Sequence, residues 1–211
     1  MILDEINYEQ TIIIDNIKRV AKERIAPIAA EMDRGGVFRW DVAQLFARMG
    51  LLQIFLPPSY GGLEQDKTLM FCLCVEEIAK ACASSALLLV IQAVGSFPII
   101  VGANKSQKDR FFPRLSKGEE LIAYLVTEPY AGSDVAGIKA KAEKVDSGYI
   151  LNGHKLFSTN GGVASLYTVL ARTGEKGLTF FVVDRDQEGV SIGKKEDKLG
   201  FRASDTSEVM L

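Results

Sequence analysis

The stretch Tyr124–Asp134, YLVTEPYAGSD, separates two parts of the chain that have different sequence patterns. It begins within a strand-like run from Leu121 to Val126, turns at Glu128-Pro129 and continues into the small residues of 131–134, Ala-Gly-Ser-Asp. Small residues let a ligand approach the backbone closely. A strand end followed by such a loop, at the junction of two domains, is where a cofactor site is expected.

Helical patterns precede this stretch. Apolar residues recur at spacings of three and four from Tyr8 to about Asp33, and again in a helix that starts near Gln65-Asp66. We expect Asp41 or the residue before it to cap a short helix, and Ser106 to cap a polar one. Residues 1–118 are therefore predicted to form an N-terminal all-α helical domain.

One uncharged run, from Ala81 to Asn104, is long enough to cross a bilayer. It contains serine, glutamine, glycine and proline, and it lacks flanking aromatic or strongly basic belts. These features favour a buried central helix that breaks between Gly95 and Pro98, with no membrane contact.

Alternating apolar and polar residues with glycine-marked turns follow from Leu121 onward, and they predict antiparallel strands. The predicted strands cover residues 139–145, 149–159, 166–172, 178–183 and 190–192, and the chain ends within another at 209–211. The strand 178–183 is predicted to be buried. The fold class is therefore α+β, with the helical domain followed by an antiparallel β-barrel-like domain at 119–211. Because a natural domain seldom ends on an apolar strand, we expect the sheet to continue beyond these residues.

Composition excludes several classes of function. The 25 basic and 27 acidic residues leave a formal net charge of -2, which offers no basic surface for nucleic acid. The cysteines at 72, 74 and 82 lie far in sequence from the single histidine, so no metal site is expected. That single histidine also leaves little from which to build a catalytic triad. The N-terminal residues match neither a secretory signal nor a transit peptide, which indicates a cytoplasmic protein.

Two short patches of hydroxyl residues lie at predicted strand ends. They suit a planar aromatic cofactor, because hydroxyl and backbone N–H groups can bind its polar edge while apolar and aromatic side chains cover its face. Ordinary strand-end hydroxyls are the competing interpretation. The patches and their apolar borders are Thr127, Ser133, Ser158 and Thr159 with Tyr124, Val126 and Phe157.

Two acids in the same region, Glu128 and Asp134, could form a catalytic carboxylate pair. Their positions, before a proline and after Gly-Ser, are equally typical of turn-forming acids.

The motif Val126-Thr127-Glu128-Pro129-x-Ala131-Gly132-Ser133-Asp134-x-x-Gly137 resembles the signature of the acyl-CoA dehydrogenase family. Three further motifs occur in family order, so the resemblance covers essentially the whole chain. They are Pro57-x-x-Tyr60-Gly61-Gly62, Asn152-Gly153-x-Lys155-x-Phe157-Ser158-Thr159-Asn160-Gly161 and Gly200-x-Arg202-x-Ser204-Asp205-Thr206.

This resemblance implies that FAD binds in extended form, with an acyl-CoA thioester, between the two domains. Hydrogen bonds from Thr127 to the pyrimidine edge of the flavin would stabilise charge on its reduced form, and Thr159 would orient N5. Ser133 is implied to contact the cofactor and the substrate at the pyrophosphate and pantetheine end, and Gly132 is also implied to bind the cofactor. The implied contacts of the flavin ring are Tyr124, Val126, Thr127, Phe157, Ser158 and Thr159.

The sequence departs from the family pattern at two positions and in one larger respect. Leu125 replaces a usually small residue, and Phe157 stands where many members have tryptophan, but both keep an apolar wall. In the family, the glutamate that removes the substrate α-proton lies in a C-terminal helical bundle, and nothing in these 211 residues replaces it. We therefore expect no catalytic residue in this chain and no activity of the chain alone.

The expected function is that of a fragment or subunit of an FAD-dependent acyl-CoA dehydrogenase. The complete enzyme would form trans-2-enoyl-CoA and pass electrons to an electron-transfer flavoprotein. It would act as a homo- or hetero-oligomer, in which a separate chain could carry the helical bundle. The alternatives are a non-catalytic binding or assembly subunit, and a relative of the acyl-CoA oxidases or flavin monooxygenases.

Overall fold

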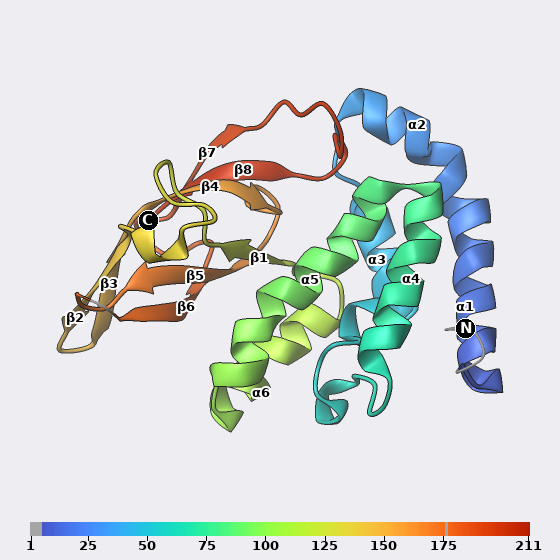
Figure 1. Cartoon of the computed structure of the whole chain (residues 1–211), viewed down its shortest axis with the longest axis horizontal. Helices are drawn as coiled ribbons and strands as arrows, with labels where there is room; N and C mark the ends of the chain where they lie inside the picture. The colour runs from blue at the N-terminus through green and yellow to red at the C-terminus, as the bar shows by residue number, and fades with distance from the viewer. Residues whose placement is uncertain (1–5, 176) are drawn as a thin grey trace. The chain divides into compact units, whose positions relative to one another are not determined.

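The computed structural model describes residues 6–175 and 177–211 (Figure 1). These residues group into two compact units. The first unit comprises residues 6–90, 116–118 and 198–204, and the second comprises 91–115, 119–197 and 205–211. The predicted domain boundary between residues 118 and 119 stays a prediction, because such units need not fold independently.

The first unit is helical. Ile17, Ile25, Phe46 and Ile78 are almost fully buried in its core. Pro27 lies in the first turn of α2, where its missing N–H is not needed, directly after a π-helical turn. The helical segments are α1 (Tyr8–Val20), the π-helical turn Ala21–Ile25, α2 (Ala26–Gly35), α3 (Trp40–Arg48) and α4 (Lys67–Ala81), with 3₁₀ turns at Leu51–Gln53 and Pro58–Tyr60.

Two of the predicted helix caps are wrong. The carboxylate of Asp41 accepts hydrogen bonds from the guanidinium of Arg39, at 2.7 and 2.8 Å, so it does not cap α3. Helix α6 (Lys105–Ser116) begins before Ser106, and its cap is a reciprocal pair. Asn104 Oδ1 accepts from the N–H of Gln107 at 2.9 Å, and Gln107 Oε1 accepts from the N–H of Asn104 at 2.9 Å.

Helix α5 (Ala83–Gly102) runs unbroken through Gly95 and Pro98, so the predicted break is wrong. Glycine at position 95 serves close packing, because a Cβ there would lie 2.7 Å from Ile122 Cγ2. Among the described residues, α5 is the one helix with the length and hydropathy of a membrane span. Polar side chains on it are nevertheless buried, and Gln92 Oε1 accepts a hydrogen bond from the N–H of Ile122 at 2.7 Å.

The second unit contains two sheets, whose strands can be followed in Figure 1. In the larger sheet the order is β1-β5-β2-β3, and β6 pairs with β5. In the smaller sheet the order is β4-β8-β7. The strands are β1 (Ile122–Leu125), β2 (Lys141–Val145), β3 (Gly148–Asn152), β4 (His154–Thr159), β5 (Leu166–Arg172), β6 (Leu178–Asp184), β7 (Ser191–Lys195) and β8 (Thr206–Met210), with a 3₁₀ turn at Val135–Gly137.

The α+β class is confirmed, but the strand predictions need four corrections. The sheets do not close into a barrel, and β1 and β2 both run parallel to β5, whereas the other pairs are antiparallel. The predicted strand 149–159 is two strands in different sheets. They part at Gly153, where a Cβ would lie 2.6 Å from that of Ala140. The predicted buried strand 178–183 is mostly half-buried.

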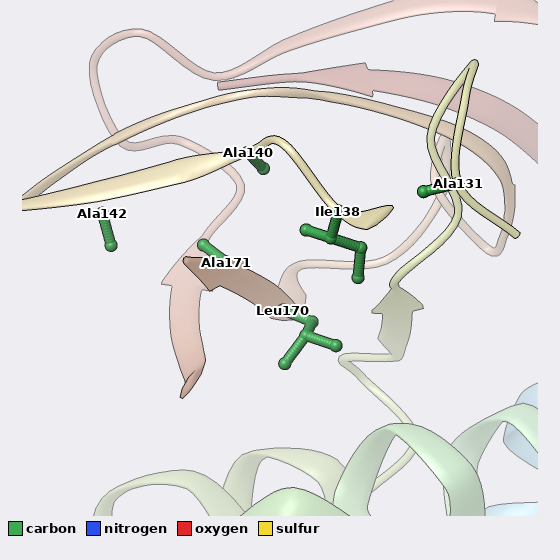
Figure 2. Close-up of a cluster of buried hydrophobic side chains, with 6 residues drawn as sticks. All are labelled: Ala131, Ile138, Ala140, Ala142, Leu170 and Ala171. Atoms are coloured by element: carbon green, nitrogen blue, oxygen red, sulfur yellow. The ribbon is translucent and has the colours of Figure 1, made fainter. Parts of the chain in front are cut away.

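A cluster of small buried side chains lies beside the start of β2, as Figure 2 shows. Alanine at most of its positions lets the loop after β1 and the segment before β2 lie close to β5. Val126 packs against this cluster, which links the core to the predicted cofactor site. Its members are Ala131, Ile138, Ala140, Ala142, Leu170 and Ala171.

Candidate functional site

The two predicted hydroxyl patches are brought together by a hydrogen bond between backbones. The N–H of Leu156, in β4, donates to the carbonyl oxygen of Thr127, just after β1, at 2.9 Å. We call residues 126–127 and 156–159 the paired segments. Thr127 and Thr159 are half-buried in them, and Phe157 is 60% exposed. Residues about 30 positions apart in sequence are therefore adjacent in the structure, and their role as one cofactor site stays a prediction.

A β-bulge shapes the second of the paired segments. Lys155 pairs with Val209 and Ser158 with Ser207, so the register of β4 on β8 shifts by one residue between these pairs. Within the bulge, Phe157 has a φ of 52°, in the left-handed region. That conformation costs a bulky residue about 1–2 kcal/mol, and it persists only where the surroundings enforce it.

The turn after β4 is fixed by buried hydrogen bonds, and it sets the position of Thr159. Asn160, with a φ of 64°, donates its N–H to the carbonyl of Asp205 at 2.9 Å. The carboxylate of Asp205 accepts from the N–H of Gly162 at 2.6 Å. Tyr167 Oη donates to the carbonyl of Gly161 at 2.8 Å, and burial raises the pKa of Tyr167 to about 12. The tyrosine therefore acts here as a neutral donor.

Ser158 carries a buried hydroxyl that has no hydrogen-bond partner among the described residues. The residue is 1% exposed. Buried polar groups are nearly always paired, with protein or with ordered water, so this hydroxyl is available to a group from outside the chain.

Tyr124 is used within the larger sheet. Its ring stacks on that of Phe180 in β6, with centroids 5.4 Å apart and planes inclined by 30°. Burial raises the pKa of its hydroxyl. Gly132 and Ser133, in contrast, lie exposed on the loop after β1. The structure thus pairs residues 126–127 with 156–159 and places Tyr124 two residues before Val126. The loop with Gly132 and Ser133 stays exposed to solvent.

A buried ion pair, which the sequence analysis did not identify, lies directly behind the paired segments. Glu128 is 8% exposed and Lys155 is fully buried. Glu128 Oε1 accepts from Lys155 Nζ at 2.8 Å and from the N–H of Ala140 at 3.0 Å, while Oε2 accepts from the N–H of Lys139 at 2.7 Å. The remaining donors of Lys155 reach the carbonyls of Val126 at 3.1 Å and of the β5 residue Leu170 at 2.7 Å.

Burial alone raises the pKa of Glu128, but the hydrogen bonds from Lys155 and from two backbone N–H groups outweigh it and leave that pKa lowered. Burial also lowers the pKa of Lys155, and its bond to Glu128 opposes this. Glu128 further closes a turn, exchanging backbone hydrogen bonds with Ala131 at 2.8 and 3.2 Å. Glu128 was predicted to be either a catalytic carboxylate or a turn-forming acid, and its contacts are those of a turn-forming acid. A lysine at a core-facing position of an alternating strand was the signal that could have revealed the pair.

The chain thus combines a helical region with two sheets and carries paired hydroxyl-bearing segments beside a strand end. Two family models match the chain in order. The N-terminal domain of acyl-CoA dehydrogenases matches residues 7–119, and the middle domain matches residues 123–211. The chain belongs to the acyl-CoA dehydrogenase family.

Among similar proteins is cyclohexane-1-carbonyl-CoA dehydrogenase of Syntrophus aciditrophicus (strain SB), which is 49% identical over 202 residues covering 94% of this chain and 53% of the relative. Butyryl-CoA dehydrogenase of Megasphaera elsdenii is 33% identical, with a TM-score of 0.91 over 98% of this chain and 56% of that one. A glutaryl-CoA dehydrogenase of Mycobacterium smegmatis, solved in complex with FADH2, is 28% identical, with a TM-score of 0.91 over 98% and 53%. This chain spans about half the length of these relatives.

FAD is the cofactor of this family, and the present chain has features that fit it. The buried hydroxyl of Ser158 has no hydrogen-bond partner among the described residues. Phe157 presents an exposed aromatic ring from a strained backbone, and Gly132 and Ser133 lie exposed on their loop. Hydroxyl, aromatic and bare backbone groups are those that a flavin with its pyrophosphate requires. The individual contacts of the eight predicted site residues stay predictions.

Proposed function

We propose that this chain forms the N-terminal and middle parts of an FAD-dependent acyl-CoA dehydrogenase, which converts an acyl-CoA thioester to the trans-2-enoyl-CoA. The main support is that both domain models of one family match the chain in order. The hydrogen bond that joins the two segments of the expected flavin site adds to it. When bound, FAD accepts the hydride that leaves the substrate β-carbon.

The chain's own residues would bind and orient the reactants. Thr127 and Thr159 would offer hydroxyls to the polar edge of the flavin, and Ser158 would gain its missing partner. Phe157 would cover one face of the ring and exclude water. Ser133 would contact the pyrophosphate and pantetheine groups. A base for the substrate α-proton would come from protein outside these residues, in the same or a neighbouring chain of an oligomer.

The substrate is inferred to be an alicyclic acyl-CoA, in which the α-carbon belongs to a ring. Support comes from the similarity to cyclohexane-1-carbonyl-CoA dehydrogenase, at 49% identity. Electron-transfer flavoprotein is the proposed acceptor of the electrons. The proposal retains the cytoplasmic location expected from the sequence.

The test is to purify the chain together with whatever chains accompany it, saturate it with FAD and add acyl-CoA without oxygen. We expect cyclohexane-1-carbonyl-CoA to bleach the visible absorbance of the oxidised flavin faster than butyryl-CoA does. A Thr159→Val variant should slow the bleaching. Thr168→Val, which changes a threonine bonded to the carbonyls of Gly95 in α5 and Ala123 in β1, should not.

Other results would contradict particular parts of the proposal. Flavin that stays oxidised with every acyl-CoA would refute dehydrogenation, and a preparation that retains no flavin would favour a non-catalytic subunit. Stoichiometric peroxide on admission of air, without need of an electron-transfer flavoprotein, would favour an oxidase.

A further inference from the structure

Lys155 is the one lysine or arginine with a buried side chain among the residues that the structure describes. Its ammonium group has three hydrogen-bonding partners, on three different segments. Val126 lies in the first of the paired segments, Glu128 in the turn that follows it, and Leu170 in β5. The side chain of Lys155 thus connects β4 to the first paired segment, to the turn at Glu128 and to β5.

The position of Lys155 is directly before the bulge that contains Phe157. The next residue, Leu156, donates its N–H to Thr127. Two adjacent residues of β4 therefore hold the backbone carbonyls of two adjacent residues, Val126 and Thr127. These contacts over-determine the backbone where Phe157 adopts its unfavourable conformation, which is the condition for such a conformation to persist.

Glu128 fixes the direction in which the lysine points. Its carboxylate is itself held by the N–H groups of Lys139 and Ala140, at the segment entering β2. A buried ion pair commonly adds little net stability compared with apolar residues of similar volume. The pair can nevertheless have a geometric role that apolar residues could not fill. Only a hydrogen-bond donor with several N–H groups can bind the carbonyls of Val126 and Leu170 at once.

We propose that the Glu128–Lys155 ion pair is a positioning device that sets the spacing of the paired segments and thereby the affinity and environment of the bound flavin ring. This inference rests on the proposed function, since it assigns the flavin to these segments. Neither residue touches the cofactor in this scheme. They act through the backbones of residues 126–127 and through the bulge at Phe157.

The test compares Lys155→Met and Glu128→Gln with Arg114→Met. Arg114 pairs with Glu120 and Asp184 in the same unit, at 2.7 and 2.8 Å, and neither partner belongs to the paired segments, so its loss controls for removal of a cation. Each protein is assayed with its accompanying chains, at temperatures where circular dichroism shows native secondary structure. The readouts are the dissociation constant for FAD, the absorption maxima of the bound flavin and the hydrogen-exchange rate of the Leu156 amide.

We expect Lys155→Met to weaken FAD binding at least tenfold, to shift the flavin absorption maxima and to speed exchange of the Leu156 amide relative to amides of β6. Glu128→Gln keeps the shape of the side chain and should give smaller changes in the same directions. Arg114→Met should leave all three readouts unchanged.

Folded Lys155→Met and Glu128→Gln proteins with wild-type affinity, spectrum and exchange would overturn the inference while leaving the proposed function intact. A wild-type protein that binds no FAD would instead refute the proposed function, and the inference with it. A faster Leu156 exchange with unchanged affinity and spectrum would also overturn the inference, because it would show a structural role alone.

Discussion

Removing one partner of the Glu128–Lys155 pair should destabilise the second unit much more than removing a surface charge. In Lys155→Met the Glu128 carboxylate, 8% exposed, would keep two backbone donors but lose the Lys155 cation. Breaking a buried pair in this way costs about 3–5 kcal/mol. Because small domains have a total stability of about 5–15 kcal/mol, the variant should remain folded but be markedly weakened.

The double variant Glu128→Gln/Lys155→Met separates the pair's coupling from the effects of the single changes. It leaves no buried charge at the site, so it should be less destabilised than the sum of the two single variants, by about 1–3 kcal/mol. Arg114→Met should cost no more than about 1 kcal/mol, since Arg114 and its partners are partly exposed. Urea unfolding followed by circular dichroism gives each free energy of unfolding.

The same proteins should differ in their response to acid. The pKa of Glu128 is lowered in the folded state, so its contribution to stability is present above the unfolded-state pKa, about 4.3, and is lost as the pH falls through the folded-state value. Wild type should therefore lose stability more steeply below that pH than Glu128→Gln does. Single variants that cost less than about 1 kcal/mol, additive effects in the double variant, and equal acid slopes would together refute this account of the pair.

Two further predictions concern packing and thiol reactivity. Gly95→Ala should lower the free energy of unfolding in urea by about 1–3 kcal/mol, because the added Cβ would lie 2.7 Å from Ile122 Cγ2. Gly102→Ala, at the last residue of the same helix, has open space around it and should change that free energy little. Equal effects of the two changes would contradict the packing role of Gly95. Burial raises the pKa of Cys74 to about 12, whereas Cys72 is exposed. An aromatic disulfide reagent should therefore modify Cys72 rapidly and Cys74 only after denaturation. Labelling of Cys74 in the native protein would contradict this and show that the helix opens.

Local sequence patterns predicted the parts of the fold that depend on local physics. Helical periodicity located α4, because it follows from which face of the helix is buried. Glycine-marked turns on either side located β5 to the residue. The patterns failed where tertiary contacts decide. The predicted helix break between Gly95 and Pro98 is absent from α5, and the lack of a side chain at Gly95 instead leaves room for Ile122. Alternation could not show that residues 149–159 cross from one sheet to the other at Gly153, because it records which side is buried and not which strand is the neighbour.

The candidate site shows the same division. Hydroxyl and aromatic residues at strand ends were visible as two patches, and the family motif joined them into one expected flavin site. Neither source of information predicted that Phe157 lies in a bulge with positive φ, since the bulge depends on the register of β4 against β8, a strand about 50 residues further along the chain.

The role of Glu128 could not be predicted from its neighbours in the sequence. Standing before proline, it looked equally suited to catalysis and to a turn, because both roles need a carboxylate near a loop. Its partner decides between them. A general base needs a pKa raised toward neutrality, whereas hydrogen bonds from Lys155, Lys139 and Ala140 lower the pKa of this group and occupy both of its oxygens. An acid held so completely can position its neighbours but is poorly suited to accept a proton, and the base of the proposed reaction must therefore be sought elsewhere.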